Sequence, residues 1–412
     1  MATTSGMRGR TTLALLRDRT FGPFTIGKIL SSCGNWVQTI AAAVLMYDLT
    51  RSAFMVGVVS VVLFGGPLLL ALWTGQLTDR WDRRIILIVG RAISAASVGL
   101  LAVLLLARGI DGFGGPSTLL VVAAAMSVGN ALTGPAMHAI TPGLVPDDDL
   151  EPALALASVA PSLARTIGPA AGAGLILLGG PGSAFAVAAA SHFAFVAVLL
   201  CIRARPQSRG TDRPGILGGV QYLIGQPSLG LLVVAMAVLA FGADPTVTLT
   251  PAMADRLGGG SELVGIFASA FGFGAVVAAF SFRLLRRLAS LRRIGVAGFV
   301  FLAAGLAGTV APSVPGATAG FVVAGSGFMM AAVALQTRIQ RQVPDQLRGR
   351  VMALWGMATL GSRPIAAPIN GAIADEVSVP AALLTAAGVV LTASLLARVR
   401  TGYVRGTGSS DA

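Results

Sequence analysis

Twelve long apolar runs constrain this chain more than any other feature of its sequence. Each run is long enough to cross the ~30 Å hydrocarbon core of a bilayer as a helix. Of the 412 residues, 55% are apolar and only 11% are charged, whereas soluble domains carry roughly one quarter charged residues. The sequence therefore predicts an all-α, multi-pass membrane protein with twelve transmembrane helices. The runs lie at residues 21–47, 52–74, 85–107, 118–139, 153–178, 181–202, 229–254, 261–282, 294–311, 316–337, 351–374 and 378–397.

These runs form two groups of six. Residues 203–228 between the groups are polar and rich in proline and glycine, which is typical of a linker. We therefore expect an N-terminal six-helix bundle at residues 1–202, a cytoplasmic linker at 203–228 and a C-terminal six-helix bundle at 229–412.

Basic residues are distributed unevenly between the two sets of loops. The loops on the side of both termini hold most of the arginines, and the opposite loops hold Arg51, Arg108 and Arg256. Basic loops face the cytoplasm, so both termini are predicted to be cytoplasmic. Orientation and lipid headgroups account for the formal charge of +13, and we expect no nucleic-acid partner. Residues 1–20 have no short apolar core, so no removable signal peptide is expected.

The two groups of six share a pattern that indicates an internal duplication. Val145-Pro146-Asp147 precedes a run that contains Arg165, and Val343-Pro344-Asp345 precedes a run that contains Arg363. The arginine follows its loop at the same distance in both copies. We therefore expect the two bundles to be pseudo-symmetric.

A ten-residue loop from Gly75 to Arg84 joins the second and third runs. An arbitrary positively charged loop would explain its arginines but not the placement of Gly75, Leu77 and Asp79. The order Gly-x-Leu-x-Asp-Arg-x-Asp-Arg-Arg resembles, position for position, the loop signature of the major facilitator superfamily. The resemblance covers nearly the whole chain and implies the major facilitator fold, in which a substrate site lies at mid-bilayer between halves that rock.

The same resemblance implies a conformational latch in this loop. Asp79 would interact with the positive N-terminal end of the eleventh helix, near Arg350, while the cytoplasmic side is closed. The arginines of the loop would bind lipid headgroups or neighbouring acids. Breaking the latch would favour the inward-open state. The latch residues are Gly75, Asp79, Arg80, Arg83, Arg84 and Arg350.

Three short strings resemble the bacterial exporter branch of the superfamily, which includes siderophore exporters and macrolide and multidrug efflux proteins. The resemblance implies export of a small amphiphilic compound, such as a drug, a siderophore or a secondary metabolite. The strings are Asn35-Trp36-Val37, Tyr47-Asp48-Leu49-Thr50 followed by Ser52, and Leu347-Arg348-Gly349-Arg350-Val351.

The fifth run contains Gly168-Pro169, which resembles the fifth-helix signature of proton-coupled antiporters. Glycine and proline weaken local hydrogen bonding, so Gly168, Pro169 and, in the second half, Pro368 are predicted to let their helices bend. The arginine that many drug antiporters carry in the fourth helix is missing here. Asn130 is the nearest strongly polar residue in that helix.

Two arginines and one carboxylate lie well inside the apolar runs. Arg165 and Arg363 stand about twelve residues into their helices, roughly 18 Å deep at 1.5 Å per residue. They are candidates to face a central cavity and hold an anionic group, and a structural role on backbone carbonyls is the alternative. Asp244, directly before Pro245, is the candidate for proton coupling, because burial disfavours the charged form of a carboxylate and so favours the uptake of a proton. An Asp-Pro helix break is the alternative for this pair.

Uncharged polar residues in the N-terminal half complete the candidate site. Asn35 and Gln38 are expected to hydrogen-bond substrate, or to hold helices together. Lys28 and Arg91 lie only one or two turns into their helices, so both are expected to snorkel to the membrane surface. His192 is expected to be a packing or hydrogen-bonding residue. The candidate cavity residues are Asn35, Gln38, Asn130, Arg165, Asp244 and Arg363.

No enzyme signature is present. The sequence has no phosphate-binding loop with lysine and no cluster of ligands spaced for a metal, so no cofactor or metal is expected. We expect a monomeric secondary transporter of the bacterial inner membrane that exports a small organic molecule in exchange for protons. Uptake, facilitated diffusion, lipid translocation and a non-transporting membrane sensor remain open alternatives.

Overall fold

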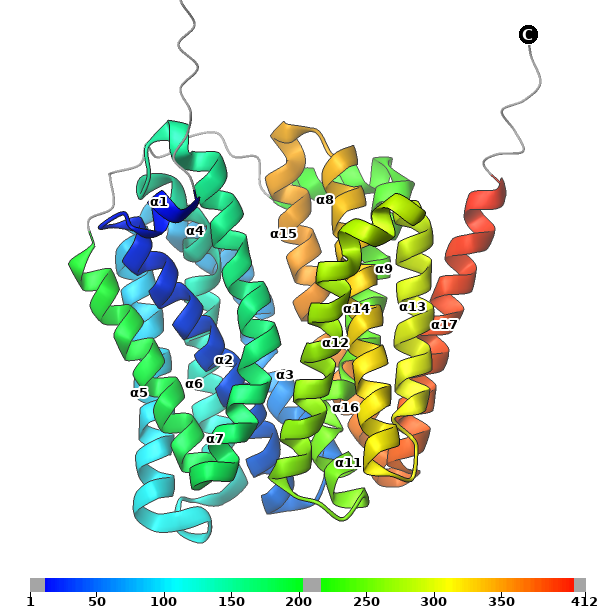
Figure 1. Cartoon of the computed structure of the whole chain (residues 1–412). Helices are drawn as coiled ribbons and strands as arrows, with labels where there is room; N and C mark the ends of the chain where they lie inside the picture. The colour runs from blue at the N-terminus through cyan, green and yellow to red at the C-terminus, as the bar shows by residue number, and fades with distance from the viewer. Residues whose placement is uncertain (1–11, 203–215, 404–412) are drawn as a thin grey trace, which may run out of the picture. The chain divides into compact units, whose positions relative to one another are not determined.

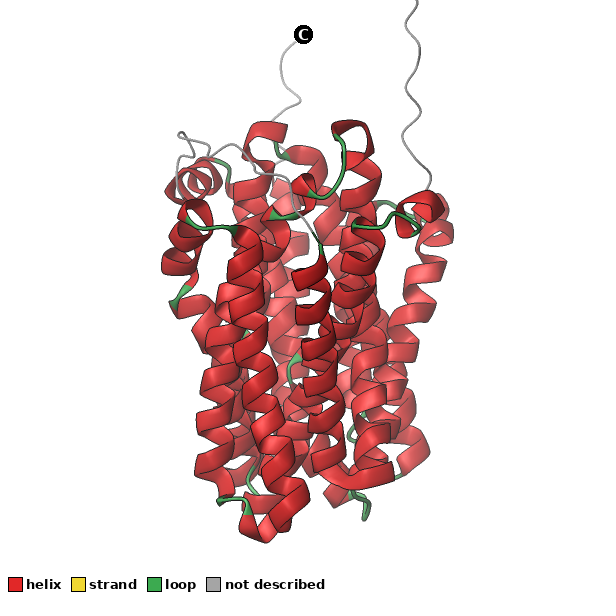
Figure 2. Cartoon of the chain, turned by 90° about the vertical axis from the view of Figure 1, so that its left-hand side faces the viewer, coloured by secondary structure: helices red, strands yellow, loops and turns green. Residues whose placement is uncertain are grey.

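The computed structural model describes residues 12–202 and 216–403, with some side chains inside the helices left out. All elements in these ranges are helical, and no strand occurs among them (Figure 2). The helices longer than three residues are α1 (Thr12–Leu16), α2 (Phe21–Thr50), α3 (Ala53–Leu69), α4 (Ala71–Arg80), α5 (Arg83–Gly112), α6 (Gly115–Ala139), α7 (Leu150–Cys201), α8 (Ile216–Gly225), α9 (Pro227–Ala243), α10 (Pro245–Thr248), α11 (Thr250–Arg256), α12 (Ser261–Leu288), α13 (Leu291–Gly308), α14 (Val314–Gln342), α15 (Asp345–Gly361), α16 (Arg363–Glu376) and α17 (Val379–Tyr403) (Figure 1).

Eight helical segments of the described chain are long and apolar enough to cross a membrane, compared with the twelve runs expected. The second run is divided into shorter helices at Leu70, and the eleventh at Ser362. The seventh run is interrupted at Asp244 but is still one of the eight segments, as Pro227–Thr248. The fifth and sixth runs lie within α7, where Gly179 and Gly180 leave the helical conformation. Gly180 has φ +74°, which glycine adopts readily because it has no Cβ. The number of helical segments long enough to cross a membrane is therefore smaller than the number of apolar runs.

The structure differs from the expected linker in one respect. Residues 216–225 of the predicted linker form the helix α8. Its Gly219 lies against Arg350 of α15, so close that an added Cβ would come within 3.1 Å of the arginine Cβ. The lack of a side chain at Gly219 thus lets this short helix pack against α15.

By its internal contacts the chain divides into two compact units. Unit 1 comprises Met1–Ala42 and Gly65–Asp212, and unit 2 comprises Ala43–Phe64 and Arg213–Ala412. The end of α2 and most of α3 therefore group with the C-terminal part of the chain. The division into bundles at the linker stays a prediction.

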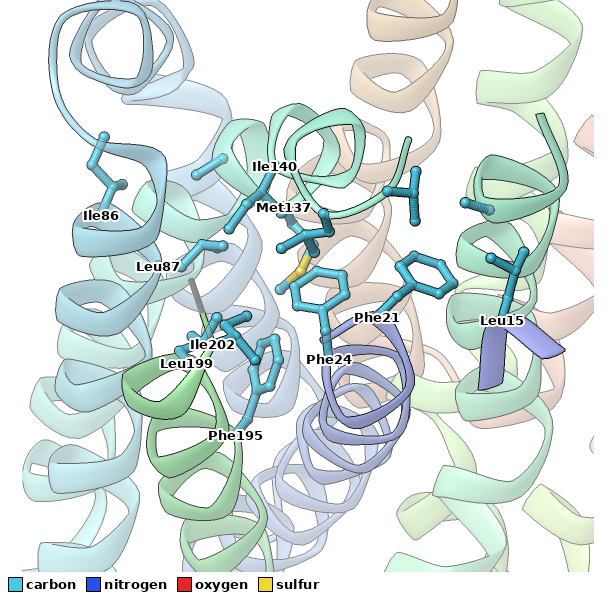
Figure 3. Packing of buried hydrophobic residues seen from close by; sticks show 14 of the residues in the cluster. Leu15, Phe21, Phe24, Ile86, Leu87, Met137, Ile140, Phe195, Leu199 and Ile202 are labelled. Atoms are coloured by element: carbon cyan, nitrogen blue, oxygen red, sulfur yellow. The ribbon is translucent and has the colours of Figure 1, made fainter. Parts of the chain in front are cut away.

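Buried aromatic and aliphatic side chains of unit 1 form a hydrophobic core cluster (Figure 3). The rings of Phe24 and Phe195 have centroids 5.8 Å apart, which joins α2 to the last part of α7. The middle of α7 also approaches α2 closely, because a Cβ at Gly168 would collide with Trp36. Gly168 and Pro169 are buried in a part of α7 without a non-helical residue.

Small residues bring the helices of unit 2 together. Helices α13 and α14 run side by side (Figure 1). A Cβ at Gly298 would come within 2.5 Å of the Ala331 backbone nitrogen, so the two backbones nearly touch. Close approach through glycine is the usual way in which helices associate inside a membrane, where the hydrophobic effect contributes little to their packing.

Candidate functional sites

A continuous chain of polar side chains crosses the interior of unit 1. It joins helices α2, α5, α6 and α7 through hydrogen bonds between residues that the apolar surroundings would otherwise leave unsatisfied. Three residues come from α2, and each of the other helices supplies one. The members are Ser31, Asn35, Gln38, Arg91, Asn130 and His192.

The hydrogen-bond partners of Gln38 and His192 determine which atoms donate and which accept in this polar group. Gln38 Nε2 donates to Asn35 Oδ1 at 3.1 Å, so Gln38 Oε1 faces His192 Nε2 at 3.2 Å and accepts from it. The neutral imidazole then carries its proton on Nε2, and Nδ1 accepts from Ser31 Oγ at 2.9 Å. His192 thus has a hydrogen bond at each ring nitrogen and is completely buried, which agrees with the hydrogen-bonding role expected for it.

Arg91 joins Asn35 to Asn130 in this group of hydrogen-bonded side chains. Its Nη1 lies 3.5 Å from Asn35 Oδ1 and 3.4 Å from Asn130 Oδ1, and the side chain is only 6% exposed. Among the described residues, none accepts a hydrogen bond from the buried Nε. Leaving a buried donor unpaired costs about 1–3 kcal/mol, and more for a charged group. The guanidinium is therefore incompletely compensated by the part of the protein that the structure describes.

The expectation that Lys28 and Arg91 snorkel to the membrane surface is wrong. Lys28 is 5% exposed, and its Nζ donates to the Ala157 carbonyl of α7 at 3.0 Å. Both basic groups are turned toward neighbouring helices. The periodicity of α2 held a signal for this, because Ser31, Asn35 and Gln38 repeat at helical spacing and line one face.

Asp244 is the central residue of a second polar group, in unit 2. It lies between α9 and α10, is 1% exposed and accepts a 2.9 Å hydrogen bond from Thr248 Oγ1. Asn370 of α16, also 1% exposed, lies beside the same carboxylate. The helix break at Asp244-Pro245 and the buried carboxylate are thus parts of one arrangement, although sequence reasoning treated them as alternatives.

Arg363 stands at the other side of this group. It begins α16 directly after the break at Ser362, and it lies close enough to Asp244 for their charges to attract. Its guanidinium carbon lies 4.8 Å from the centroid of the Phe64 ring, a cation–π contact. Two broken helices therefore bring an acid and a base together inside the second unit.

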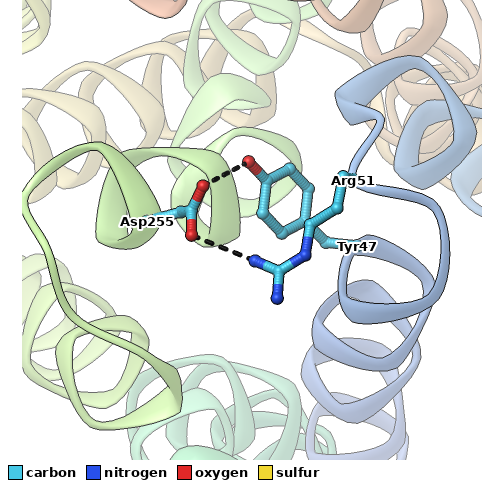
Figure 4. Close-up of polar contacts among 3 residues, drawn as sticks. All are labelled: Tyr47, Arg51 and Asp255. Atoms are coloured by element: carbon cyan, nitrogen blue, oxygen red, sulfur yellow. Dashed lines mark hydrogen bonds and ion pairs between the residues drawn. The ribbon is translucent and has the colours of Figure 1, made fainter.

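The carboxylate of Asp255 is one of two that hold the turn between α2 and α3 in unit 2. Asp255 Oδ1 accepts from Arg51 Nη1 at 3.0 Å, and its Oδ2 accepts from Tyr47 Oη at 3.3 Å (Figure 4). Arg51 has φ +51°, a left-handed conformation that is uncommon for a residue with a side chain. Sequence reasoning assigned no role to Arg51 or Asp255.

Asp375 of α16 holds the same turn from another side. Its Oδ1 accepts from the backbone N–H of Ala53 at 2.8 Å, and its Oδ2 accepts from the Phe54 N–H at 3.0 Å and from Ser52 Oγ at 2.6 Å. The carboxylate thereby satisfies amides at the start of α3 that have no partner within the helix. No local sequence signal marks this cap, since the acid comes from a distant part of the chain.

The expected ten-residue loop from Gly75 to Arg84 is mostly helical in the structure of unit 1. Its first part, up to Arg80, belongs to α4, its two last arginines begin α5, and only Trp81 and Asp82 lie between these helices. Asp82 caps α5 by accepting from the Arg84 backbone N–H at 2.8 Å. Arg83 Nη1 donates to the Ala139 carbonyl at 3.0 Å, and Arg84 donates through Nε to the Leu199 carbonyl at 2.6 Å and through Nη2 to that of Leu200 at 2.7 Å. The partners seen for these two arginines are thus helix-end carbonyls of α6 and α7.

For the remaining predicted site residues, the structure gives the position in a helix but no contact that bears on the predicted role. Gly75 and Arg80 lie within α4, and Arg80 is exposed. Arg350 is half-buried in α15 and Pro368 lies inside α16. The side chains of Asp79 and Arg165 lie outside those that the structure describes, so the predicted latch contact and the predicted Arg165–Arg363 pair stay predictions.

Comparison with known proteins establishes the family of this chain. The family model described as transmembrane secretion effector, a branch of the major facilitator superfamily, matches residues 10–407. The chain is a major facilitator superfamily transporter. Members of this superfamily are transporters and not enzymes, which confirms the expectation from the loop signature at Gly75–Arg84.

Curated relatives agree with this assignment. The chain is 27% identical over 390 residues to the enterobactin exporter EntS of Shigella boydii serotype 18 (strain CDC 3083-94 / BS512), covering 91% of this chain and 90% of the relative. The same figures hold for the enterobactin exporter EntS of Escherichia coli O139:H28 (strain E24377A / ETEC).

Solved structures show the same fold at low sequence identity. A bacterial homologue of the human lysosomal transporter Spinster, in an inward-facing and occupied conformation, aligns with a TM-score of 0.72 at 15% identity over 92% of this chain and 95% of the homologue. A D-xylose–proton symporter aligns with a TM-score of 0.70 at 13% identity over 92% of this chain and 97% of the symporter. The all-helical membrane fold predicted from the apolar runs is therefore confirmed.

Proposed function

We propose that this transporter exports a small amphiphilic organic compound, such as a drug, a siderophore or a secondary metabolite, by proton antiport and alternating access. The similarity to enterobactin exporters over nine-tenths of the chain supports export as the direction. The proposed setting is the inner membrane of a bacterium, with the protein as a monomer. Twelve transmembrane helices would form two pseudo-symmetric bundles with both termini in the cytoplasm.

The observation that carries proton coupling is the buried group around Asp244. Transporters commonly place substrate and ion sites at discontinuous membrane helices, where the interrupted backbone leaves polar groups available. Asp244 and Arg363 stand at two such interruptions and attract each other. Protonation of Asp244 would remove that attraction and release Arg363, and deprotonation would restore it. The gain or loss of one proton at Asp244 would thereby change the attraction between two interrupted helices.

The hydrogen-bonded polar side chains inside unit 1, which include Asn35, Arg91 and Asn130, are proposed to bind the substrate. Asn35 and Asn130 are half-buried, so a ligand can reach them, whereas Gln38 and His192 behind them are buried. Amide groups held by a fixed hydrogen-bond chain provide oriented polar contacts for a mostly apolar compound. Arg165 is retained as a further candidate from its position in α7.

Transport by the purified protein in proteoliposomes tests this function. Vesicles carrying an imposed pH gradient are mixed with enterobactin, and both its accumulation and the movement of protons are recorded. Coupled antiport predicts that the pH gradient drives substrate accumulation, that protons move in the opposite direction, and that a protonophore abolishes the accumulation. Movement that ignores both the pH gradient and the membrane voltage would contradict the proposal, and accumulation together with protons in the same direction would indicate symport.

A further inference from the structure

Arg91 carries a charge that the described part of unit 1 does not neutralise. Its partners are two amide oxygens at 3.4 and 3.5 Å, and no described carboxylate contacts it. A charged group inside a membrane normally has a counter-charge or faces a polar cavity, because the hydrocarbon does not solvate it. The arrangement around Arg91 is therefore suited to an anion that comes from outside the polypeptide.

One edge of the guanidinium remains open to such an anion. Nη1 points to Asn35 and Asn130. On the other edge, the buried Nε has no acceptor among the described residues, and the hydrogen bonds of Arg91 to described residues do not involve the neighbouring Nη2. Two parallel N–H groups on one edge match the two oxygens of a carboxylate or of a phosphate. The occupied and the open edges thus have different roles, with Nη1 fixing the side chain and the other edge left for a ligand.

The neighbouring amides add further donors. Asn35 and Asn130 both direct Oδ1 toward Arg91, which leaves their Nδ2 groups without an acceptor in the described part of the chain. Gln38 holds Asn35 in this orientation by donating to the same Oδ1 at 3.1 Å. The unsatisfied groups here are all donors, and such a set favours an anion over a cation.

We infer that Arg91, with the amide groups of Asn35 and Asn130, binds an anionic group of the transported compound, a carboxylate or another oxyanion on an amphiphilic body. This inference rests on the proposed function and names the substrate class for the same site. Lys28, at the same helical face of α2 and bound to the Ala157 carbonyl, adds basic character to that face. The apolar body of the compound would provide the hydrophobic contact, and the anion would provide the selectivity.

Binding to the purified full-length protein in nanodiscs tests the assignment with two probes. Fluorescein and rhodamine 6G share a xanthene core, but fluorescein is an anion and rhodamine 6G a cation. Wild-type protein is expected to bind fluorescein at least about tenfold more tightly, because hydrogen bonds to charged groups are among the stronger ones. Arg91→Gln should lose about tenfold or more of the fluorescein affinity, and Arg91→Lys should retain an intermediate affinity.

Asn130→Asp supplies a second variant that keeps the shape of the site. Its carboxylate would face Arg91 in place of the amide oxygen and act as an internal counter-ion, so fluorescein binding should fall although the side-chain volume is unchanged. Arg286→Gln, which removes a half-buried arginine of unit 2 bound to the Ala289 carbonyl, is the matched control and should bind as the wild type does.

The outcomes separate this inference from the proposed function. No saturable binding of fluorescein, a preference for rhodamine 6G, or wild-type affinity in both Arg91→Gln and Asn130→Asp would overturn the anion site. A protein that binds fluorescein through Arg91 but moves no solute across proteoliposomes would keep the anion site and refute the carrier function.

Discussion

Asp375 accepts a 2.6 Å hydrogen bond from the hydroxyl of Ser52, a residue 323 positions earlier in the chain. The same carboxylate accepts from the amides of Ala53 and Phe54, so it acts as a helix cap that another helix supplies. Caps of this kind are usually provided by the residue that precedes the helix. Here the start of α3 depends on α16, and the two helices are expected to form or separate together.

Replacing Asp375 by Asn should therefore destabilise the protein. The amide retains one acceptor oxygen where the carboxylate has two, and it lacks the negative charge that the start of a helix favours. We expect a loss of about 0.5–2 kcal/mol, the range for removing a cap, measured as a lower unfolding midpoint in detergent. Glu376→Gln, at the exposed neighbouring position, should leave the midpoint unchanged. Equal midpoints for the two variants would show that the cap contributes nothing.

The Arg51–Asp255 ion pair should contribute much less. Its side chains are 64% and 53% exposed, and exposed pairs typically contribute about 0.2–1 kcal/mol and weaken in salt. A double-mutant cycle with Arg51→Gln and Asp255→Asn should give a coupling energy within that range, and less at high ionic strength. A coupling energy well above about 1 kcal/mol that persists in high salt would show that the pair is more strongly shielded from solvent than its exposure indicates.

Asp244→Asn should uncouple transport from the proton gradient. The amide keeps the size of the side chain and can still accept from Thr248, but it cannot lose a proton or attract Arg363 as a charge. We expect loss of proton-driven accumulation with retained folded protein, measured by transport in proteoliposomes and by size-exclusion elution. Glu262→Gln, an exposed acid of the same unit, is the control. Full pH-driven accumulation by the Asp244 variant would exclude this residue as the proton carrier.

Gly371→Ala should disturb the packing of α16 on α3. A Cβ at Gly371 would lie within 2.5 Å of the Ala53 carbonyl oxygen and 2.6 Å of Phe54 Cα, and these backbone atoms cannot rotate away. Overpacking of this kind costs about 1–3 kcal/mol, which a thermal-unfolding scan in detergent would detect. Gly388→Ala in α17 has no atom within 4 Å of the new Cβ and should be neutral or slightly stabilising. An unchanged unfolding temperature for Gly371→Ala would show that the two helices can separate at little cost.

Asp79→Asn tests the predicted latch. If Asp79 holds the closed cytoplasmic side, its neutralisation should abolish transport while the yield of folded protein stays normal. Asp111→Asn, an exposed acid at the far end of α5, serves as the control. Wild-type transport by the Asp79 variant would remove the latch from the mechanism.

Local sequence signals predicted the class of this protein because those signals act over short distances. The apolar runs require a membrane, and the loop at Gly75–Arg84 identifies the superfamily through residue order alone. The helix break at Asp244-Pro245 could also be read from the sequence, because proline removes a backbone donor wherever it stands. None of these features depends on which helices become neighbours.

Tertiary structure alone decided which polar groups meet. Arg91 looked able to reach the membrane surface from its place in the sequence, but the acceptors on α2 and α6 hold it inside unit 1. Asp375 caps a helix that begins more than three hundred residues earlier, and Arg363 reaches Asp244 and Phe64 only because broken helices pack together. The physical reason is that a buried charge or amide is stabilised by whichever partner folding brings within a few ångströms, and sequence distance carries no information about that partner.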